Sequence, residues 1–393
     1  MTAGVARTFL IWTCLRAVFH RGYVLTSSLY FVVTAHLSAA QLLLLGTVVA
    51  VTMLVSDIPT GVWADALSRT WPLAAGHGFL AAGMVVTGLV TDFPWIVVTQ
   101  VSWGLGWALS AGADVAWLSD ELGQPRRTAQ VLVAAARWEL VGGAAGMVVF
   151  GVLGWAVDLA TAIVVPGVGM AMLGLYVAVR FTERGFTPAR ERRWTASLSI
   201  FRRGLRLAWR DHEILLVLAA TVIVNGAGVI GWLLPRRLVD LGFPDDPTLW
   251  YTALGILASA AGVVALRVVQ ARIDGTGVAR RVYALSCLLG ALALILLACA
   301  PNALIGALGV LLVSGIAFTL TRAVSVVWVN RRTTSDVRAT VHSFLSQAET
   351  SGEIVGGIAL AALARAAGTP ATLVIAGLAI AGAGAMVAWA RLR

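Results

Sequence analysis

Twelve long apolar segments constrain the fold of this chain more than any other feature. A transmembrane helix needs about 20 consecutive apolar residues, and every segment reaches that length. The runs are continuous, whereas barrel strands alternate apolar and polar residues over about 10 positions. The sequence therefore predicts an all-α membrane protein with twelve transmembrane helices. They cover approximately residues 9–33, 41–63, 72–91, 94–118, 128–154, 159–179, 212–234, 249–271, 281–300, 302–328, 339–364 and 369–390.

The composition agrees with this prediction. Of the 393 residues, 59% are hydrophobic and 12% are charged, and the mean hydropathy is +0.87. Soluble domains carry roughly 25% charged residues, and a soluble sphere of the present composition would expose large apolar patches. Most of the chain is therefore expected to contact membrane lipid.

The basic residues exclude several function classes and set an orientation. All 29 are arginine, so a Walker-type phosphate loop and Schiff-base lysine chemistry are both absent from the sequence. Of these arginines, 21 lie on the side that contains both termini and only three lie in the opposite loops. The positive-inside rule then places both termini in the cytoplasm. An arginine-only, alanine- and glycine-rich chain suggests a GC-rich bacterial genome, and hence a bacterial cell membrane.

Motifs of enzymes, metal sites and cofactors are missing from the sequence. It contains no Gly-x-Ser-x-Gly, His-Glu-x-x-His or Cys-x-x-Cys pattern. The three cysteines lie in apolar runs and are interpreted as buried apolar residues. We expect no enzyme activity, cofactor, metal or nucleic-acid partner, and a monomer whose partners are a small-molecule substrate, protons and lipid.

Two internal repeats indicate two related halves. Residues 114–118 recur in pattern at 325–329, a shift of 211, and residues 139–143 recur at 353–357, a shift of 214. Nearly equal shifts that superimpose helices of the same orientation indicate a parallel repeat of six helices.

The domains predicted from this repeat are two six-helix bundles, 1–182 and 211–393, joined by an arginine-rich cytoplasmic linker at 183–210. Within the linker, Ser197–Arg210 has the pattern of an amphipathic helix on the inner leaflet. A plain linker held near the membrane by its charge explains the same residues.

The segment 57–69 carries the most specific motif. It reads Asp-Ile-Pro-Thr-Gly-Val-Trp-Ala-Asp-Ala-Leu-Ser-Arg and resembles the signature loop Gly-x-x-x-Asp-Arg-x-Gly-Arg-Arg of the major facilitator superfamily. Gly61, Asp65 and Arg69 match this loop, whereas Ala66, Ser68 and Thr70 depart from it.

This resemblance implies the fold of that superfamily, in which two bundles rock around a central site. In the superfamily the loop latches the bundles on the cytoplasmic side. We therefore assign a cytoplasmic gate loop to Asp57, Gly61, Asp65 and Arg69.

Segments 110–122 and 338–343 are similar to those of bacterial efflux facilitators. The drug–proton antiporters among them carry an arginine in the fourth helix, where the nearest residue here is Gln100, and a Gly-Pro pair in the fifth helix, which is missing. Export is thus implied by the wider family rather than by its antiporter motifs.

Four ionisable side chains inside predicted helices are candidates for proton coupling. Charged groups within the membrane are costly and are often functional. Glu349 and Glu353 lie one helical turn apart and repel each other when both are ionised. Glu353 has Glu139 as its repeat mate. His20 is a candidate because the unperturbed pKa of a histidine side chain lies near neutrality. A structural histidine bonded to a backbone carbonyl explains His20 as well.

A second set of side chains is predicted to line a substrate cavity because its members are polar or aromatic and recur on helix faces. It comprises Arg16, Tyr23, Tyr30, Trp103, Trp107, Asp114, Arg137, Asn225, Arg322 and Gln347. Static buried ion pairs, an interfacial tryptophan belt and interhelical hydrogen bonds are the alternatives for individual members.

The function predicted from these observations is secondary transport, with proton-coupled export of a small apolar or cationic organic compound. Proton-coupled uptake of an anionic metabolite, held by the buried arginines, is the first alternative. A membrane scaffold or sensor that does not transport is the second.

Overall fold

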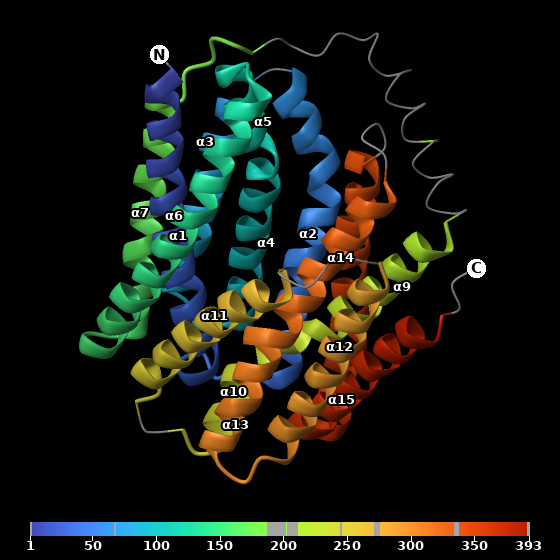
Figure 1. Cartoon of the computed structure of the whole chain (residues 1–393). Helices are drawn as coiled ribbons and strands as arrows, with labels where there is room; N and C mark the ends of the chain where they lie inside the picture. Colours follow the sequence, from blue (N-terminus) through green and yellow to red (C-terminus); the bar gives the residue numbers. More distant parts are fainter. Residues whose placement is uncertain are drawn as a thin grey trace. The chain divides into compact units, whose positions relative to one another are not determined.

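The computed structural model describes residues 2–66, 68–186, 202, 211–243, 246–270, 276–333 and 338–390. Every regular element among these residues is a helix (Figure 1), which confirms the predicted all-α class. Apart from Arg202, the predicted amphipathic stretch Ser197–Arg210 lies outside the described residues.

The first half of the chain forms seven helical elements. They are α1 (Thr2–Val33), α2 (Ala39–Ala66), α3 (Thr70–Thr87), α4 (Phe93–Ser110), α5 (Ala113–Leu122), α6 (Pro125–Ala156) and α7 (Leu159–Arg180). The second half continues with α9 (His212–Gly228), the 3-10 turn η1 (Val229–Leu233), α10 (Leu234–Asp240), α11 (Thr248–Gln270), α12 (Thr276–Cys299), α13 (Ala303–Val310), the π-helical η2 (Leu311–Ala317), α14 (Phe318–Arg332) and α15 (Arg338–Trp389).

The predicted helix 94–118 is interrupted, contrary to the prediction of one continuous helix. It forms α4 and α5, which are separated by Ala111 and Gly112. Gly112 has φ 76°, in the left-handed region, and the N–H of Ala111 already donates to the carbonyl of Trp107. A left-handed glycine ends a helix without the steric penalty that a side chain would bring. The break redirects the chain just before Asp114.

Four other predicted helices also contain irregularities or joins. The segment 212–234 passes through the 3-10 turn η1, and 302–328 contains the π-helical stretch η2. The last two predicted helices run together as α15, which is kinked at Gly368 with φ 79°. When α15 is divided at this kink and the interrupted helices are each counted once, the described residues contain twelve helical segments. Eight of the helices, counting α15 once, are long and apolar enough to cross a membrane.

Polar side chains set where several of these helices begin. Ser38 and Gln41 exchange hydrogen bonds in a capping box before α2, with N···O distances of 3.3 and 2.8 Å. Asp158 accepts from the N–H of Thr161 at 2.7 Å before α7, and Asp211 accepts from that of Glu213 at 2.9 Å before α9. Each contact satisfies a backbone donor that the first turn of a helix leaves free.

The helices form two compact units that follow the halves of the chain except at two short segments. The N-terminal unit comprises Met1–Leu37, Val51–Arg190 and Asp246–Thr252, and the C-terminal unit comprises the rest. The start of α2 belongs to the C-terminal unit, where Gly357 lies against Thr47. The start of α11 belongs to the N-terminal unit, where Gly151 lies against Thr252.

Small residues bring one pair of helices into close contact in each unit. In the N-terminal unit, Gly142 and Gly146 of α6 face the backbone of α1 at Cys14 and Val18. Figure 1 shows α1 and α6 side by side. A β-carbon at either glycine would collide with a main-chain carbonyl. Such small-residue contacts are typical of helices packed within a membrane.

The matching pair in the C-terminal unit is α9 and α15. Here Gly352 and Gly356 face the backbone at Val222 and Gly226. The internal repeat of the sequence is therefore visible as a repeated mode of helix packing.

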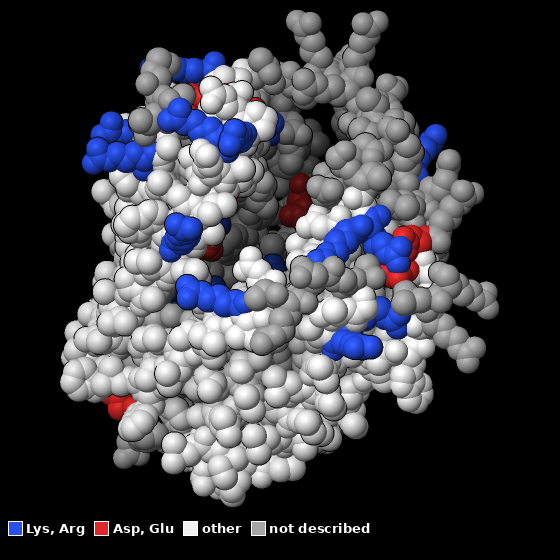
Figure 2. All heavy atoms as spheres, viewed as in Figure 1, with Lys and Arg blue, Asp and Glu red and all other residues white. Residues whose placement is uncertain are grey.

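Arginines gather at one end of the N-terminal unit. Arg126 and Arg127 lie in the first turn of α6, and Arg180 lies in the last turn of α7. Figure 2 shows basic side chains at this end, toward the upper left of the view. This is the end at which α1 and α6 begin and α5 and α7 finish.

Candidate functional site

The most elaborate polar site in the described residues lies inside the N-terminal unit. We call it the N-terminal polar cluster, and it consists of Arg16, His20, Trp103, Trp107 and Asp114. The guanidinium of Arg16 lies over the rings of Trp12 and Trp107, at 4.8 Å from each centroid. Its Nη1 is 3.5 Å from Oδ2 of Asp114. The arginine is thus held between two aromatic faces and one carboxylate.

The break at Gly112 explains how Asp114 reaches this position. Asp114 lies in the first turn of α5, where the helix dipole and free backbone N–H groups favour a negative charge. Its Oδ1 accepts from the N–H of Val115 at 2.8 Å, which leaves Oδ2 for the arginine. A continuous helix would have lacked this new N-terminus.

His20 lies one turn after Arg16 and packs between the two tryptophans of α4. Its ring stacks on Trp103, with centroids 5.8 Å apart and 18° between the planes. Trp107 meets it edge-on at 4.9 Å and 77°. Because Trp103 and Trp107 are four residues apart, they lie on the same face of α4. The spacing in the sequence predicted this shared face.

Tyr23 and Gln100 continue the cluster on its other side. The Tyr23 hydroxyl lies 3.4 Å from Oγ1 of Thr87, and Gln100 donates to Tyr23 at 3.5 Å and to Thr99 at 3.2 Å. Gln100 is buried. Gln100, the residue nearest to the position of the antiporter arginine, therefore forms hydrogen bonds within the N-terminal unit.

Four buried polar atoms of the N-terminal polar cluster have no hydrogen-bond partner among the described residues. They are Nη1 of Arg16, Nε2 of His20, and Nε1 of both Trp103 and Trp107. Buried polar atoms in folded proteins nearly always have a partner, so an unpaired group calls for an explanation. All four atoms lie on adjacent side chains, and those of Arg16, Trp103 and Trp107 can only donate.

A second ionisable group of side chains lies in the C-terminal unit. We call it the C-terminal acid cluster, and it consists of Arg322 of α14 with Glu349 and Glu353 of α15. Nη2 of Arg322 is 3.8 Å from Oε2 of Glu349. The arginine side chain is 78% exposed and that of Glu349 is 20% exposed. Glu353 is half-buried one turn further along α15.

The remaining side chains predicted for the cavity, together with Glu139 predicted for proton coupling, are not members of these two clusters. Arg137, Glu139 and Gln347 are exposed. Tyr30 donates to the carbonyl of Val90 at 3.1 Å, and Asn225 donates to the carbonyl of Thr221 in its own helix at 2.9 Å. The last two contacts are those expected of structural residues, and the roles of all five in substrate binding or coupling stay predictions.

The predicted gate loop lies at the end of α2 and the start of α3. Arg69 is 3.5 Å from Asp120 of α5, and Asp57 is exposed. Gly61 has open space around it. The side chain of Asp65 lies outside the described structure, so its role as a latch stays a prediction.

Two buried groups were not predicted from the sequence. His77 accepts from Nε1 of Trp12 at 3.0 Å, and its Nδ1 lies 2.7 Å from the carbonyl of Leu73, which makes it a fully bonded neutral histidine. Glu213 accepts from Trp328 at 2.9 Å and pairs with Arg332. Trp328 occupies the repeat position of Trp117, and this repeat was the feature of the sequence that could have pointed to the contact between Trp328 and Glu213.

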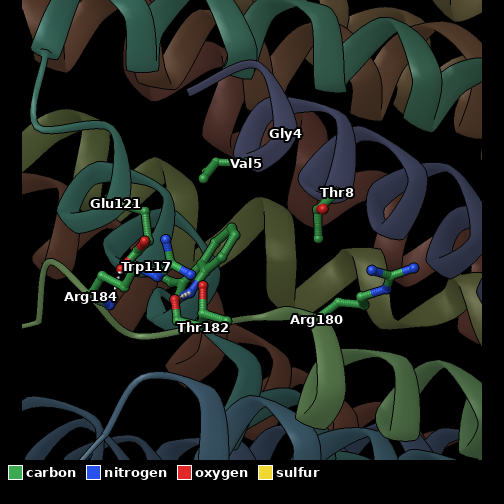
Figure 3. A pocket seen from close by; sticks show the side chains of 8 residues that line it. All are labelled: Gly4, Val5, Thr8, Trp117, Glu121, Arg180, Thr182 and Arg184. Atoms are coloured by element: carbon green, nitrogen blue, oxygen red, sulfur yellow. Dashed lines mark hydrogen bonds between the residues drawn. The ribbon is translucent and has the colours of Figure 1, made fainter. Parts of the chain in front are cut away.

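A separate cavity of about 270 Å³ opens at the arginine-rich end of the N-terminal unit. Figure 3 shows its lining residues, which come from the start of α1, from α5, and from the end of α7 and the residues that follow it. Glu121 accepts here from the backbone N–H groups of Arg184 and Gly185, at 2.6 and 2.8 Å. Since these contacts join helix ends, we interpret this region as structural.

The sequence matches the family model of the Major Facilitator Superfamily over residues 9–356. No curated protein matches it. Several solved structures have a similar fold. Nucleoside transporter NupG is 13% identical, with 98% of this chain and 100% of that chain covered and a TM-score of 0.75. A bacterial homolog of the human lysosomal transporter Spinster is 14% identical, with 98% and 96% covered and a TM-score of 0.75. A POT family transporter crystallised with a thioalcohol-conjugated peptide is 10% identical, with 98% and 95% covered and a TM-score of 0.73.

Proposed function

Because the chain belongs to the Major Facilitator Superfamily, we propose that it exports a small, largely apolar organic compound by alternating access, in exchange for protons. The family establishes a multi-pass membrane transporter of small molecules and not an enzyme. Proton coupling, direction and the class of compound are the proposal.

The observation that carries proton coupling is the C-terminal acid cluster. Glu349 and Glu353 lie one turn apart in a membrane helix, and Arg322 supplies one positive charge at 3.8 Å from the first of them. One arginine cannot neutralise two carboxylates, and an uncompensated charge within the membrane is costly. Binding one proton removes that surplus charge. The cluster therefore has the composition of a proton carrier.

Coupling then follows from competition within one binding cycle. A ligand shifts a conformational equilibrium only through different affinities for the two states. We propose that protonation of Glu353 stabilises one of the two states of the transporter, inward-facing or outward-facing. The bound compound stabilises the form in which Glu353 has lost its proton. Glu349 stays paired with Arg322 and sets the local charge.

The proposed direction and orientation rest on the sequence. The resemblance to efflux facilitators favours export, and the arginine-rich end of the N-terminal unit is expected to be cytoplasmic. Uptake with protons is the alternative, and a scaffold on the same fold would tolerate neutral substitution of the buried charges.

The test is compound-triggered proton movement in proteoliposomes that contain a pH dye. Cationic, neutral and carboxylate compounds are applied to the wild-type protein and to Glu353→Gln. We expect the wild type to move protons against the compound and Glu353→Gln to abolish the signal. Glu121→Gln is the matched control, because its amide oxygen still accepts from Arg184 and Gly185, and its signal should be unchanged.

The sign of the pH change separates the proposed antiport from the symport of the uptake alternative, since antiport and symport move protons in opposite directions relative to the compound. A wild-type signal that survives in Glu353→Gln would contradict the assigned carrier. Silence of the wild type toward every compound would contradict proton coupling.

A further inference from the structure

We infer that the N-terminal polar cluster recognises a carbonyl-type oxygen, as in a carboxylate or an amide, attached to a flat apolar ring of the transported compound. This inference rests on the proposed transport function and names the chemistry of its substrate. It weighs against a cationic compound, which was one of the two classes, apolar or cationic, that the sequence predicted.

Most of the unpaired atoms of the cluster are hydrogen-bond donors, so an acceptor on the ligand would satisfy them. Indole N–H groups and guanidinium N–H groups only donate, and three of the four unpaired atoms belong to Trp103, Trp107 and Arg16. The fourth, Nε2 of His20, either donates or accepts according to its tautomer. An oxygen with two lone pairs complements this set, whereas an ammonium group would add a further donor.

Other buried tryptophans show that unpaired indoles are not the rule in this fold. Nε1 of Trp12 donates to His77 at 3.0 Å, that of Trp117 to the carbonyl of Thr182 at 3.1 Å, and that of Trp328 to Glu213 at 2.9 Å. The fold thus supplies partners for buried indoles where they are structural. Trp103 and Trp107 differ from these three.

One aromatic ring of the cluster, that of Trp107, is already covered by a cation of the protein itself. Arg16 covers one face of Trp107 at 4.8 Å, so the cation–π interaction that would attract a cationic compound is used within the unit. Arg16 repels a second positive charge and attracts a carboxylate or carbonyl oxygen, and the carboxylate of Asp114 offsets part of both effects.

The pairing of Arg16 with Asp114 does not use every donor of the guanidinium. Nη1 lies 3.5 Å from the carboxylate without forming a hydrogen bond, so this ion pair leaves a donor available. A neutral carbonyl can bind without breaking the pair, and a carboxylate can share the guanidinium with Asp114. The indole walls contributed by Trp103 and Trp107, whose rings lie 5.8 Å apart at 71°, provide apolar contacts for a ring.

The test is equilibrium binding to the purified protein in detergent, where no proton gradient is needed. Three probes share one ring and differ in the polar group: 1-naphthoate, 1-naphthamide and 1-naphthylmethylammonium. We expect naphthoate and naphthamide to bind at least about 10-fold more tightly than the ammonium compound. The double variant Trp103→Phe/Trp107→Phe keeps aromatic rings but removes both N–H donors, and should weaken naphthamide binding about 10-fold, as two lost hydrogen bonds predict.

Trp95→Phe is the matched control, because Trp95 lies on the same helix with 59% of its surface exposed. Its affinities should equal those of the wild type. A monodisperse, helical double variant with unchanged affinity would overturn the inference, as would a preference for the ammonium probe or no binding of any probe. Glu353→Gln should bind naphthamide normally, so failure of proton coupling and failure of recognition give different results.

Discussion

The N-terminal polar cluster and the C-terminal acid cluster lie in related halves but offer opposite chemistry. The first presents unpaired donors between aromatic rings, with its arginine half enclosed by Trp12 and Trp107. The second presents two carboxylates and an arginine that is 78% exposed. One suits recognition of an acceptor and the other suits exchange of a proton.

The sequence repeat shows where this difference arises. The positions 211 residues after Trp103 and Trp107 are Ser314 and Phe318, which lack an indole donor, and the position 214 residues before Glu349 is Ala135. The glycine contacts between α1 and α6 recur between α9 and α15. The repeat therefore extends to the packing of the helices and to the glutamates at 139 and 353, but not to the indole donors of Trp103 and Trp107 or to Glu349.

The assignment of two roles to two clusters would be wrong if one cluster carried out both substrate recognition and proton exchange. Glu353→Gln should abolish compound-triggered proton movement while changing naphthamide affinity by less than about 2-fold. Trp103→Phe/Trp107→Phe should lower that affinity about 10-fold, or about 1.4 kcal/mol, while compound bound at saturating concentration still moves protons. Binding and proteoliposome assays on both variants measure this. Loss of both activities in both variants would show a single shared site.

The mode of helix packing that the two units share can be tested by substituting its glycines. Gly146→Ala in α6 and Gly352→Ala in α15 each place a β-carbon against a main-chain carbonyl, of Val18 and Val222 respectively. Because the backbone of a packed helix cannot rotate away, we expect each variant to lose about 2 kcal/mol of unfolding free energy in detergent.

Gly78→Ala is the control for these two variants, since a β-carbon at this position would meet nothing within 4 Å. Alanine should leave stability unchanged or raise it by up to about 1 kcal/mol, because glycine is a poor helix former. A large loss at only one of Gly146 and Gly352 would show that the two units pack differently.

The smallest effects are expected at the ion pairs near the helix ends. The Glu213 side chain is 9% exposed and pairs with Arg332, so Glu213→Gln should cost about 1 kcal/mol while its amide oxygen still accepts from Trp328. Asp120 is 34% exposed and lies 3.5 Å from Arg69, so Asp120→Asn should cost less. Thermal unfolding of both variants measures the difference. An equal or larger loss for Asp120→Asn would show that burial does not govern these pairs.

The sequence predicted the helices better than it predicted their irregularities. Apolar length located the segments, because lipid requires long runs of apolar side chains. The break at Gly112 and the π-helical stretch Leu311–Ala317 were missed. A glycine inside an apolar run is compatible with both a straight and a broken helix, and packing against neighbours decides between them.

The candidate site was predicted as residues but not as an arrangement. Spacing alone put Arg16, His20 and Tyr23 on one face of α1, and Trp103 and Trp107 on one face of α4. Helical periodicity does not say which face meets which neighbour.

Sequence alone was sufficient for the class, the transmembrane segments and the two-fold repeat, because apolar length, arginine placement and repeated glycines are properties of local segments. Only the tertiary structure decided which polar atoms find partners. Arg16 meets Asp114 and Trp107 from positions about 90 residues away, and Trp12 meets His77 across 65 residues. Whether a buried donor is satisfied depends on these distant contacts.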